Sequence, residues 1–348
     1  MANQTPAGAT PGINEPAVTE WFIRHVEGAV APLRFTLVAG GRSNLTYRVD
    51  AANGTSYVLR RPPLGHLLPS AHDMAREHRI ISALGPTAVP VPRALGYCAD
   101  ESVSDRPFYV MSFVDGHIVR DIASADVLEL AARDAASRSL IDVLADLHGV
   151  AIDAIGLGDL GKREFYVERQ LRRWHGQFTQ SKAREIPLID ELHDKLRTQV
   201  PLQQRVSLVH GDYRLDNTMV ASDGHVMAVL DWELCAIGDP LADLGSLLVY
   251  WPEPGELSPP LGEAATMAPG FFSRAQVCER YAQRSELDLS DMSFYVAFGM
   301  WKLACILEGV YVRYKTGAMG GDGYDFMALE ANVPVLAQRS AEALKGIR

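Results

Sequence analysis

A polar loop inside an otherwise helical half of the chain constrains the fold most strongly. The segment 210–217, HGDYRLDN, is bracketed by short apolar runs that are typical of strands. Asp212 and Asn217 both lie on this loop, and Asp231 follows the next hairpin. Carboxylate and amide oxygens are the ligands that Mg²⁺ prefers in proteins. The pattern therefore predicts three oxygen-bearing side chains that converge on one divalent ion.

The first third of the chain is typical of a small sheet. Apolar segments at 35–49, 57–61 and 108–114 have the composition of strands, and a glycine-containing loop interrupts the first of them. Helical patterns cover 18–30 and a segment that begins near residue 70 and ends at Gly85. We therefore expect a strand-rich lobe with one key helix after its first strands.

The remainder of the chain is mainly helical in pattern. From residue 123 onward, apolar residues recur every three or four positions, except around the polar loop. We expect an α+β fold with a disordered tail at 1–16, an N-terminal strand-rich lobe at 17–114 and a larger helical lobe at 115–348. The small lobe is expected to contain an antiparallel sheet.

Charge and cysteine content exclude several classes of partner. The 348 residues include 33 Lys and Arg against 43 Asp and Glu, so the net charge is −10. Such a chain has no general attraction for nucleic acid or anionic lipid, and we expect neither a nucleic-acid nor a membrane partner. Four widely spaced cysteines without zinc-ligand spacing, and a first segment without a basic start or apolar run, lead us to expect a cytoplasmic protein.

The polar loop also carries a family resemblance. Protein-kinase catalytic loops use the same H-x-D-x-x-x-x-N spacing. The chain resembles the aminoglycoside phosphotransferase and choline kinase superfamily in the sequences at 210–217, 230–233 (LDWE) and 238–244 (GDPLADL). This resemblance implies a bilobal protein-kinase-like fold. The antiparallel lobe at 17–114 is then the N-terminal nucleotide-binding lobe, and the mainly helical lobe at 115–348 is the catalytic and acceptor-binding lobe.

The resemblance also implies roles for individual residues. Asp212 is expected to orient and deprotonate the acceptor, while Asn217 and Asp231 hold Mg²⁺. Arg60 occupies the position where the family has a lysine, and Glu77 is its expected partner. ATP or GTP is the expected co-substrate, and the sequence leaves open which of the two is used.

Two further segments are candidates for nucleotide binding. Gly41, Ser43 and Asn44 lie in a loop between strands, where backbone and side-chain donors suit phosphate oxygens. A simple tight turn is the alternative. Met111 and Phe113 resemble the segment between kinase lobes whose backbone binds a purine, and ordinary core packing is the alternative.

The position of Glu77 supports its pairing with Arg60. Glu77 shares the apolar face of its helix with Met74 and Ile81, and burying a carboxylate there is costly without a cation. The alternative is that Glu77 lies at the edge of this face and reaches water.

Three other polar residues are interpreted as structural. Asp239 and Asp243 are expected to accept hydrogen bonds from backbone N–H groups near the catalytic loop and a helix start, and His210 is expected to brace the loop. Capping of turns and helices is also the alternative explanation for the three predicted catalytic and metal-binding residues.

The acceptor is less constrained by the sequence. The segments 59–72 and 166–174 look like the kinase-like domain associated with acyl-CoA dehydrogenases, which implies a hydroxyacyl-CoA-like acceptor. Arg169, Arg172 and Arg173 form one cationic helix face that suits an anionic acceptor, unless it is simply a solvated face. We therefore expect an enzyme, a small-molecule kinase that phosphorylates a hydroxyl group.

Three alternatives stay open at this point. A pseudokinase-like module that binds nucleotide or acyl-CoA without turnover is suggested by Arg60 in place of lysine. An aminoglycoside phosphotransferase would use the same loop on a different acceptor. A metal-dependent phosphohydrolase built on Asp212 and Asp231 would need further ligands.

Overall fold

The chain divides into two compact units, which are described separately. The computed structural model describes residues 10–39, 44–64, 72–256, 263–317 and 326–346. The units are Met1–Asp115 and Gly116–Arg348. A five-stranded antiparallel sheet lies in the first, and most helices lie in the second, so the expected α+β class is confirmed.

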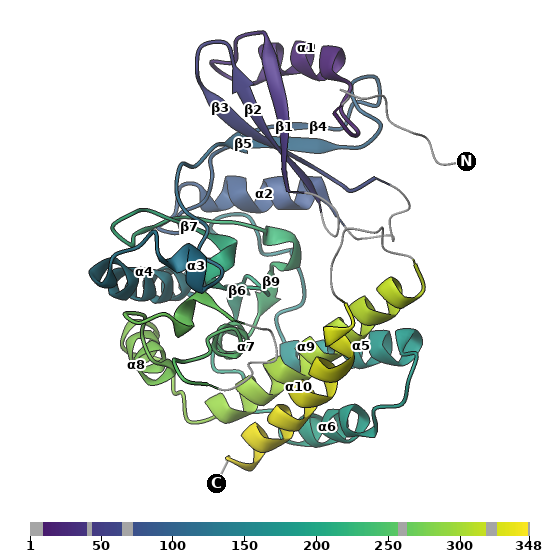
Figure 1. Ribbon diagram of the computed structural model, residues 1–348, viewed down its shortest axis with the longest axis vertical. Coiled ribbons are helices and arrows are strands. Elements are labelled where there is room, and N and C mark those ends of the chain that lie inside the picture. Colours follow the sequence, from purple (N-terminus) through teal and green to yellow (C-terminus); the bar gives the residue numbers. More distant parts are fainter. Residues whose placement is uncertain (1–9, 40–43, 65–71, 257–262, 318–325, 347–348) are drawn as a thin grey trace. The chain divides into compact units, whose positions relative to one another are not determined.

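The first unit is built on its sheet (Figure 1). The strands are β1 (Leu33–Ala39), β2 (Leu45–Ala51), β3 (Ser56–Arg61), β4 (Ala94–Cys98) and β5 (Phe108–Ser112). They follow the order β1-β2-β3-β5-β4, and every neighbouring pair is antiparallel. Strand β4 was not predicted, because Pro90 and Pro92 just before it are typical of irregular chain.

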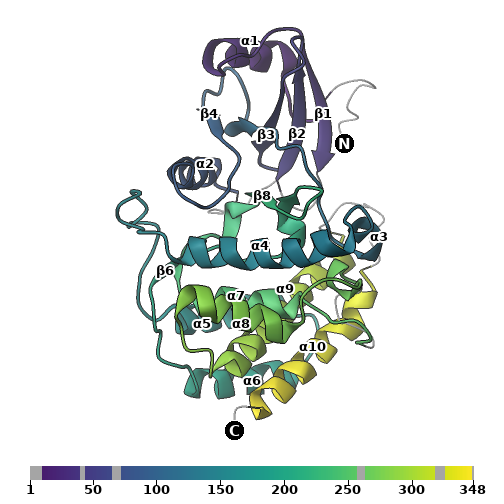
Figure 2. The same ribbon diagram turned by 90° about the vertical axis from the view of Figure 1, so that its left-hand side faces the viewer.

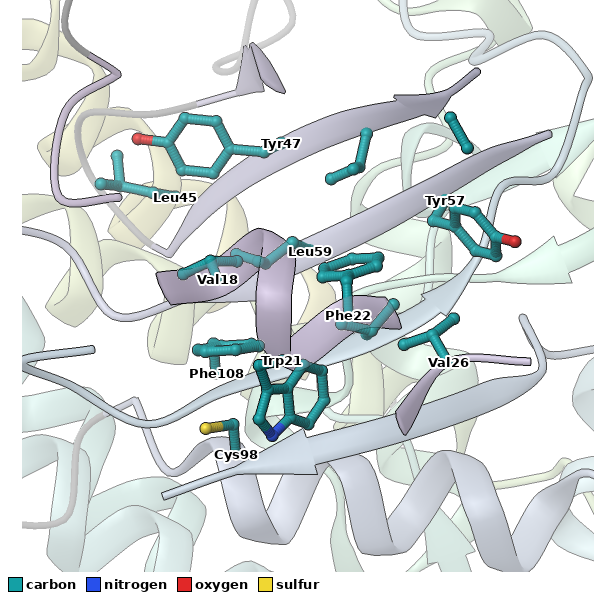
Figure 3. Close-up of a cluster of buried hydrophobic side chains, with 13 residues drawn as sticks. Val18, Trp21, Phe22, Val26, Leu45, Tyr47, Tyr57, Leu59, Cys98 and Phe108 are labelled. Atoms are coloured by element: carbon teal, nitrogen blue, oxygen red, sulfur yellow. The ribbon is translucent and has the colours of Figure 1, made fainter. Parts of the chain in front are cut away.

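Helix α1 (Glu15–His25) covers one face of the sheet with aromatic side chains. Trp21 and Phe22 are buried against Phe108 and Tyr57, as Figure 3 shows. The helix ends at His25 rather than continuing to residue 30 as its pattern predicted. The chain is already extended at the next residue and reaches a left-handed glycine two residues later, which helical geometry does not allow.

Helix α2 (Met74–Leu84) lies on the opposite face of the sheet (Figures 1 and 2). Asp73 caps it, with its side chain accepting a hydrogen bond of 3.0 Å from the backbone N–H of Arg76. The start predicted near residue 70 falls on residues outside the described ranges. The helix buries Glu77, together with its apolar residues, against the sheet.

The second unit is mainly helical, as predicted. Its helices are α3 (Ile122–Ala125), α4 (Leu130–His148), α5 (Tyr166–Ser181), α6 (Pro187–Thr198), α7 (Pro240–Val249), α8 (Arg274–Ser285), α9 (Met292–Lys315) and α10 (Ala328–Lys345), with short 3₁₀ turns η1 (Leu215–Asn217), η2 (Trp232–Leu234) and η3 (Ala265–Met267). Two small antiparallel ladders, β6 (Ser207–Val209) with β9 (Ala236–Gly238) and β7 (Thr218–Val220) with β8 (Val226–Val229), interrupt the helices. Figure 2 shows α4 running beneath β8.

Helix α9 is the centre of this unit. It packs against α5, α6, α7 and α10, and most of its residues are buried by them. Its 24 residues are long and apolar enough to cross a membrane by length and composition, and 61% of its most apolar window is buried inside the protein. In the part of the chain with described coordinates, it is the one helix that meets this criterion. Its apolar character is accounted for by its neighbours.

Candidate active site

The two small ladders of the second unit position the loop 210–217. Strand β6 ends at Val209, directly before the loop, and β7 begins directly after Asn217. Thr218 pairs with Val229, and the N–H of Leu230 donates to the carbonyl oxygen of Asn217 at 2.8 Å. Local strand pairing therefore places Asn217 beside the residue that precedes Asp231. The sequence predicted these short strands correctly, apart from β9.

Asp212 and Asn217 are in direct contact. The Asn217 side-chain nitrogen Nδ2 donates to the backbone oxygen of Asp212 at 2.8 Å and to its carboxylate Oδ2 at 2.9 Å. These bonds hold the Asp212 carboxylate in one orientation and leave the Asn217 amide oxygen for another partner. The predicted pair thus shares one site.

Asp231 has a left-handed backbone, with φ of 63°. Such a conformation costs a non-glycine residue about 1–2 kcal/mol, although aspartate tolerates it better than most residues. It begins the turn η2, immediately after β8. The strand pairing and this turn together direct the chain at Asp231 away from the ladder.

These donors fit a magnesium ion that is shared with phosphate groups. Among the residues with described positions, no group of three or more His, Cys, Asp or Glu side chains could hold a metal alone. Mg²⁺ keeps several waters and is usually bound through one or two protein oxygens plus substrate phosphates. An Asn217 amide oxygen and an Asp231 carboxylate are donors of this kind, whereas a hydrolase-type cluster of carboxylates is not found among these residues.

Asp243, on α7, holds the start of the loop 210–217, which is the predicted catalytic loop. Its carboxylate accepts hydrogen bonds from the backbone N–H groups of His210 at 2.5 Å and Gly211 at 2.8 Å. His148 Nε2 lies 3.4 Å from the same carboxylate. Burial alone would raise the pKa of Asp243, but the hydrogen bond and charge of His148 outweigh it and lower that pKa. The structural role predicted for Asp243 is confirmed.

Asp239 and His210 also have the predicted structural roles. Asp239 caps α7 by accepting from Leu241 N at 3.0 Å, and it accepts from the Tyr295 hydroxyl at 2.7 Å. His210 donates from Nε2 to the Leu230 carbonyl at 2.9 Å, while its Nδ1 accepts from Asp212 N at 3.3 Å. His210 therefore joins the catalytic loop to the segment that carries Asp231.

Arg214 is a charged residue of this loop that the sequence analysis missed. Its Nε lies 3.4 Å from Asp212 Oδ2 and 3.2 Å from Asp216 Oδ1, and its guanidinium stacks 4.8 Å from the Tyr250 ring centroid. Burial would lower the pKa of Arg214, but the charges of Asp212 and Asp216 raise it. Its position two residues after Asp212 was the signal that could have indicated it.

A pocket opens beside Asp212 within the second unit. Its lining residues come from the catalytic loop, from η2 and from the helices α7 and α9. They are Gly211, Asp212, Leu234, Ser246, Val249, Tyr250, Gly299, Lys302, Leu303 and Ile306. Sequence reasoning predicted Asp212 alone as a functional residue of this set, because the pocket joins segments that are distant along the chain.

The Arg60–Glu77 pair expected in the first unit is present. Arg60 Nε lies 3.1 Å from Glu77 Oε2, and the two side chains are 10% and 2% exposed. Glu77 also accepts hydrogen bonds from Asn44 Nδ2 at 3.0 Å and from the Tyr109 hydroxyl at 3.1 Å. His72 Nδ1 in turn donates to Asn44 Oδ1 at 2.8 Å. Asn44 therefore belongs to the Glu77 network, which the loop interpretation did not predict.

The structure does not test the other residues that were predicted to contact the nucleotide. Gly41 and Ser43 lie outside the described residues. Met111 is buried in β5, where its register partners on the neighbouring strands are Val58 and Ala94. Phe113 packs under the Arg48 guanidinium, at 4.6 Å from the ring centroid. Purine binding by this segment stays a prediction.

Comparison with known proteins identifies the family. The model of a family described as the phosphotransferase enzyme family, of the aminoglycoside phosphotransferase (APH) type, matches residues 34–278. The chain belongs to this phosphotransferase family. The matched region contains both the Arg60–Glu77 pair and the catalytic loop, and the resemblance inferred from the sequence is confirmed.

Curated relatives of this phosphotransferase are much longer proteins. Acyl-CoA dehydrogenase family member 10 of Mus musculus is 35% identical over 323 residues, which cover 91% of this chain and 30% of that protein. Acyl-CoA dehydrogenase family member 11 of Rattus norvegicus is 36% identical over 82% of this chain and 37% of that protein. The chain thus spans about a third of the length of these relatives.

Solved structures confirm the kinase-like fold. A protein of Ralstonia eutropha, provisionally named an aminoglycoside phosphotransferase, is 34% identical, with a TM-score of 0.78 over 95% of this chain and 98% of that one. Choline kinase from Cryptosporidium parvum has a TM-score of 0.66 over 95% of this chain and 97% of its own, at 12% identity. A thermostable mutant of the aminoglycoside phosphotransferase APH(4)-Ia, solved with ADP and hygromycin B, has a TM-score of 0.64 at 16% identity, over 95% and 98% of the two chains. The last two likenesses concern the fold alone.

Proposed function

We propose that this phosphotransferase moves the γ-phosphoryl group of ATP or GTP to a hydroxyl group of a small molecule. The observation that carries the proposal is the Asp212–Asn217 pair, held by Asp243 and placed beside the segment that leads to Asp231. An Asp oriented by an Asn, within the spacing of a kinase catalytic loop, has the geometry needed to align a hydroxyl.

Each residue of the loop is assigned a separate role in phosphoryl transfer. The acceptor oxygen forms a bond to the γ-phosphorus while the bond to the β–γ bridging oxygen breaks, and Asp212 accepts the hydroxyl proton. Asn217 and Asp231 would hold Mg²⁺, which supplies charge neutralisation at the phosphate oxygens. Arg214, beside Asp212, keeps the loop ordered and offsets its negative charge.

Arg60 is proposed to bind the nucleotide phosphates. Glu77 fixes the guanidinium from one side, as a partner carboxylate fixes the corresponding lysine in kinases. Arginine retains the positive charge and binds phosphate in a bidentate manner, although its planar fork differs from an ammonium group. This substitution also motivates the alternative of a weakly active nucleotide-binding module.

The acceptor is proposed to be a hydroxyacyl-CoA-like metabolite. The names of the relatives refer to acyl-CoA dehydrogenases, and the chain covers only part of them. On α5, Arg173 is exposed and stacks 4.9 Å from the Trp174 ring, while Arg169 donates to the Lys162 carbonyl at 2.7 Å. An exposed cation on this helix favours an anionic acceptor over a polycationic aminoglycoside.

We retain the proposal of a cytoplasmic location.

The test is phosphate transfer by the purified chain. Radiolabelled ATP and GTP with Mg²⁺ are offered together with hydroxyacyl-CoAs and, separately, with aminoglycosides. Replacing the proton acceptor in Asp212→Asn is expected to lower the rate about 10²–10⁴-fold. Asp223→Asn, in the β7–β8 turn, is the matched control and should retain activity. Nucleotide binding without any phosphate transfer would favour the pseudokinase alternative. Phosphate transfer to aminoglycosides alone would refute the proposal of a hydroxyacyl-CoA-like acceptor.

A further inference from the structure

Lys302 lies where helix α9 meets the catalytic loop. Its Nζ donates to the Gly211 carbonyl at 3.0 Å, and its side chain lines the same pocket as Asp212. The Trp174 ring centroid is 6.0 Å from Nζ. A cation therefore stands beside the residue proposed to accept the hydroxyl proton, although it comes from a distant part of the sequence.

Among the described residues, the Lys302 ammonium group has fewer hydrogen-bond acceptors than it has N–H donors. An ammonium group has three N–H donors. Within the described part of the chain, Gly211 O is its one hydrogen-bond acceptor, and Asp243 and Asp212 act on Nζ through their charges without a hydrogen bond to it. Two donors are thus left for a molecule in the pocket.

The surroundings of Lys302 make an ammonium group without a full set of hydrogen-bond partners energetically unfavourable. Burial lowers the pKa of Lys302, and the more distant charges of Asp243 and Asp212 oppose that effect, while Arg173 reinforces it. Apolar side chains such as Leu234 and Ile306 line much of the pocket. Lys302 is half-buried, and a partly desolvated charge without a full set of partners is unfavourable, so a purely structural role explains it less well than ligand binding does.

We propose that Lys302 is a specificity-determining residue that binds the acceptor hydroxyl oxygen in the pocket beside Asp212. This inference rests on the proposed function and adds the residue that selects the acceptor. Asp212 accepts the proton of the hydroxyl, and Lys302 donates to a lone pair of the same oxygen. Because the amine is a donor and a cation, it favours neutral or anionic hydroxyl compounds and disfavours cationic ones.

Equilibrium binding tests the proposal without turnover. The probes are 3-hydroxybutyryl-CoA, butyryl-CoA, which lacks the hydroxyl, and choline as a small cationic alcohol. Calorimetric titration of the wild-type chain with Mg²⁺ and a non-hydrolysable ATP analogue should show tighter binding of the hydroxylated thioester. Lys302→Met keeps the side-chain length and is expected to lose about tenfold in affinity for 3-hydroxybutyryl-CoA and little for butyryl-CoA.

Two controls separate this role from folding. Lys315→Met removes a cation from the C-terminal end of α9, where Nζ donates to the Tyr311 hydroxyl, and should leave both affinities unchanged. Lys302→Arg keeps the charge and should retain part of the preference for the hydroxylated thioester. Affinity for the ATP analogue should be the same in all variants, which shows that the nucleotide site is intact.

The outcomes are distinguishable. Equal losses for the hydroxylated and unhydroxylated thioesters in Lys302→Met would overturn the proposal, as would tighter binding of choline than of 3-hydroxybutyryl-CoA by the wild type. Failure of the wild type to transfer phosphate despite this selective binding would instead overturn the proposed function and leave Lys302 as a binding residue.

Discussion

Replacing Asp243 with Asn tests whether this carboxylate organises the catalytic loop. Asp243 is 2% exposed and accepts two backbone N–H bonds, from His210 and Gly211. Asn has the same shape but only one acceptor oxygen, so one backbone N–H would face the amide NH₂ group instead. A backbone N–H has no alternative role, because it cannot accept a hydrogen bond.

The expected cost follows from these bonds. Each hydrogen bond to a charged group contributes about 1.5–3 kcal/mol, and a buried donor left without an acceptor costs about 1–3 kcal/mol. Loss of one bond and weakening of the other predict a destabilisation of about 3–5 kcal/mol, within the range for breaking a buried charged pair. For a unit the size of Gly116–Arg348, this corresponds to a Tm lowered by about 6–20 °C.

Asp239→Asn is the matched control for this prediction. Its partners are one backbone N–H and the Tyr295 hydroxyl, which can reverse its bond and accept from the new amide. We expect it to cost about 1 kcal/mol, since Asn is also a good helix N-cap. Thermal unfolding by calorimetry compares the two variants with the wild type. Equal Tm values for Asp243→Asn and Asp239→Asn would refute the reasoning.

Three further outcomes are expected. The pKa of Asp243 is lowered on folding, so the ionised carboxylate stabilises the fold at pH values above its ordinary pKa of 3.8, and this stabilisation is lost as the pH falls through the pKa of the folded state. The difference in free energy of unfolding between the wild type and Asp243→Asn should therefore shrink when unfolding is measured at acidic pH. A difference that does not change with pH would contradict this. Glu77→Gln should raise the Kd for Mg-ATP about tenfold in fluorescence titrations. An unchanged Kd would show that the Glu77 network does not contribute to nucleotide binding. Gly245→Ala would place a Cβ 2.6 Å from the Tyr295 carbonyl and should cost about 1–3 kcal/mol in urea unfolding, whereas Gly176→Ala, with open space, should be neutral or stabilising.

Much of the site could be predicted because its residues are close in sequence. Asp212 and Asn217 lie on one loop between two short strands, and their contact follows from local geometry. The Arg60–Glu77 contact was predictable for a different reason, since a carboxylate on the apolar face of a helix needs a cation. The helix end at His25 and the strand β4 were missed, because turn geometry and tertiary pairing outweighed local patterns there.

The sequence by itself determined the α+β class, the position of the polar loop 210–217 and the family, because strand and helix periodicity and motif spacing are local properties of the chain. Only the tertiary structure brought Lys302 to the Gly211 carbonyl and Tyr109 to Glu77. Those residues lie on distant elements, and their side chains meet through helix packing and strand register. Packing of this kind depends on the whole unit, so no short window of sequence encodes which polar groups will share a pocket.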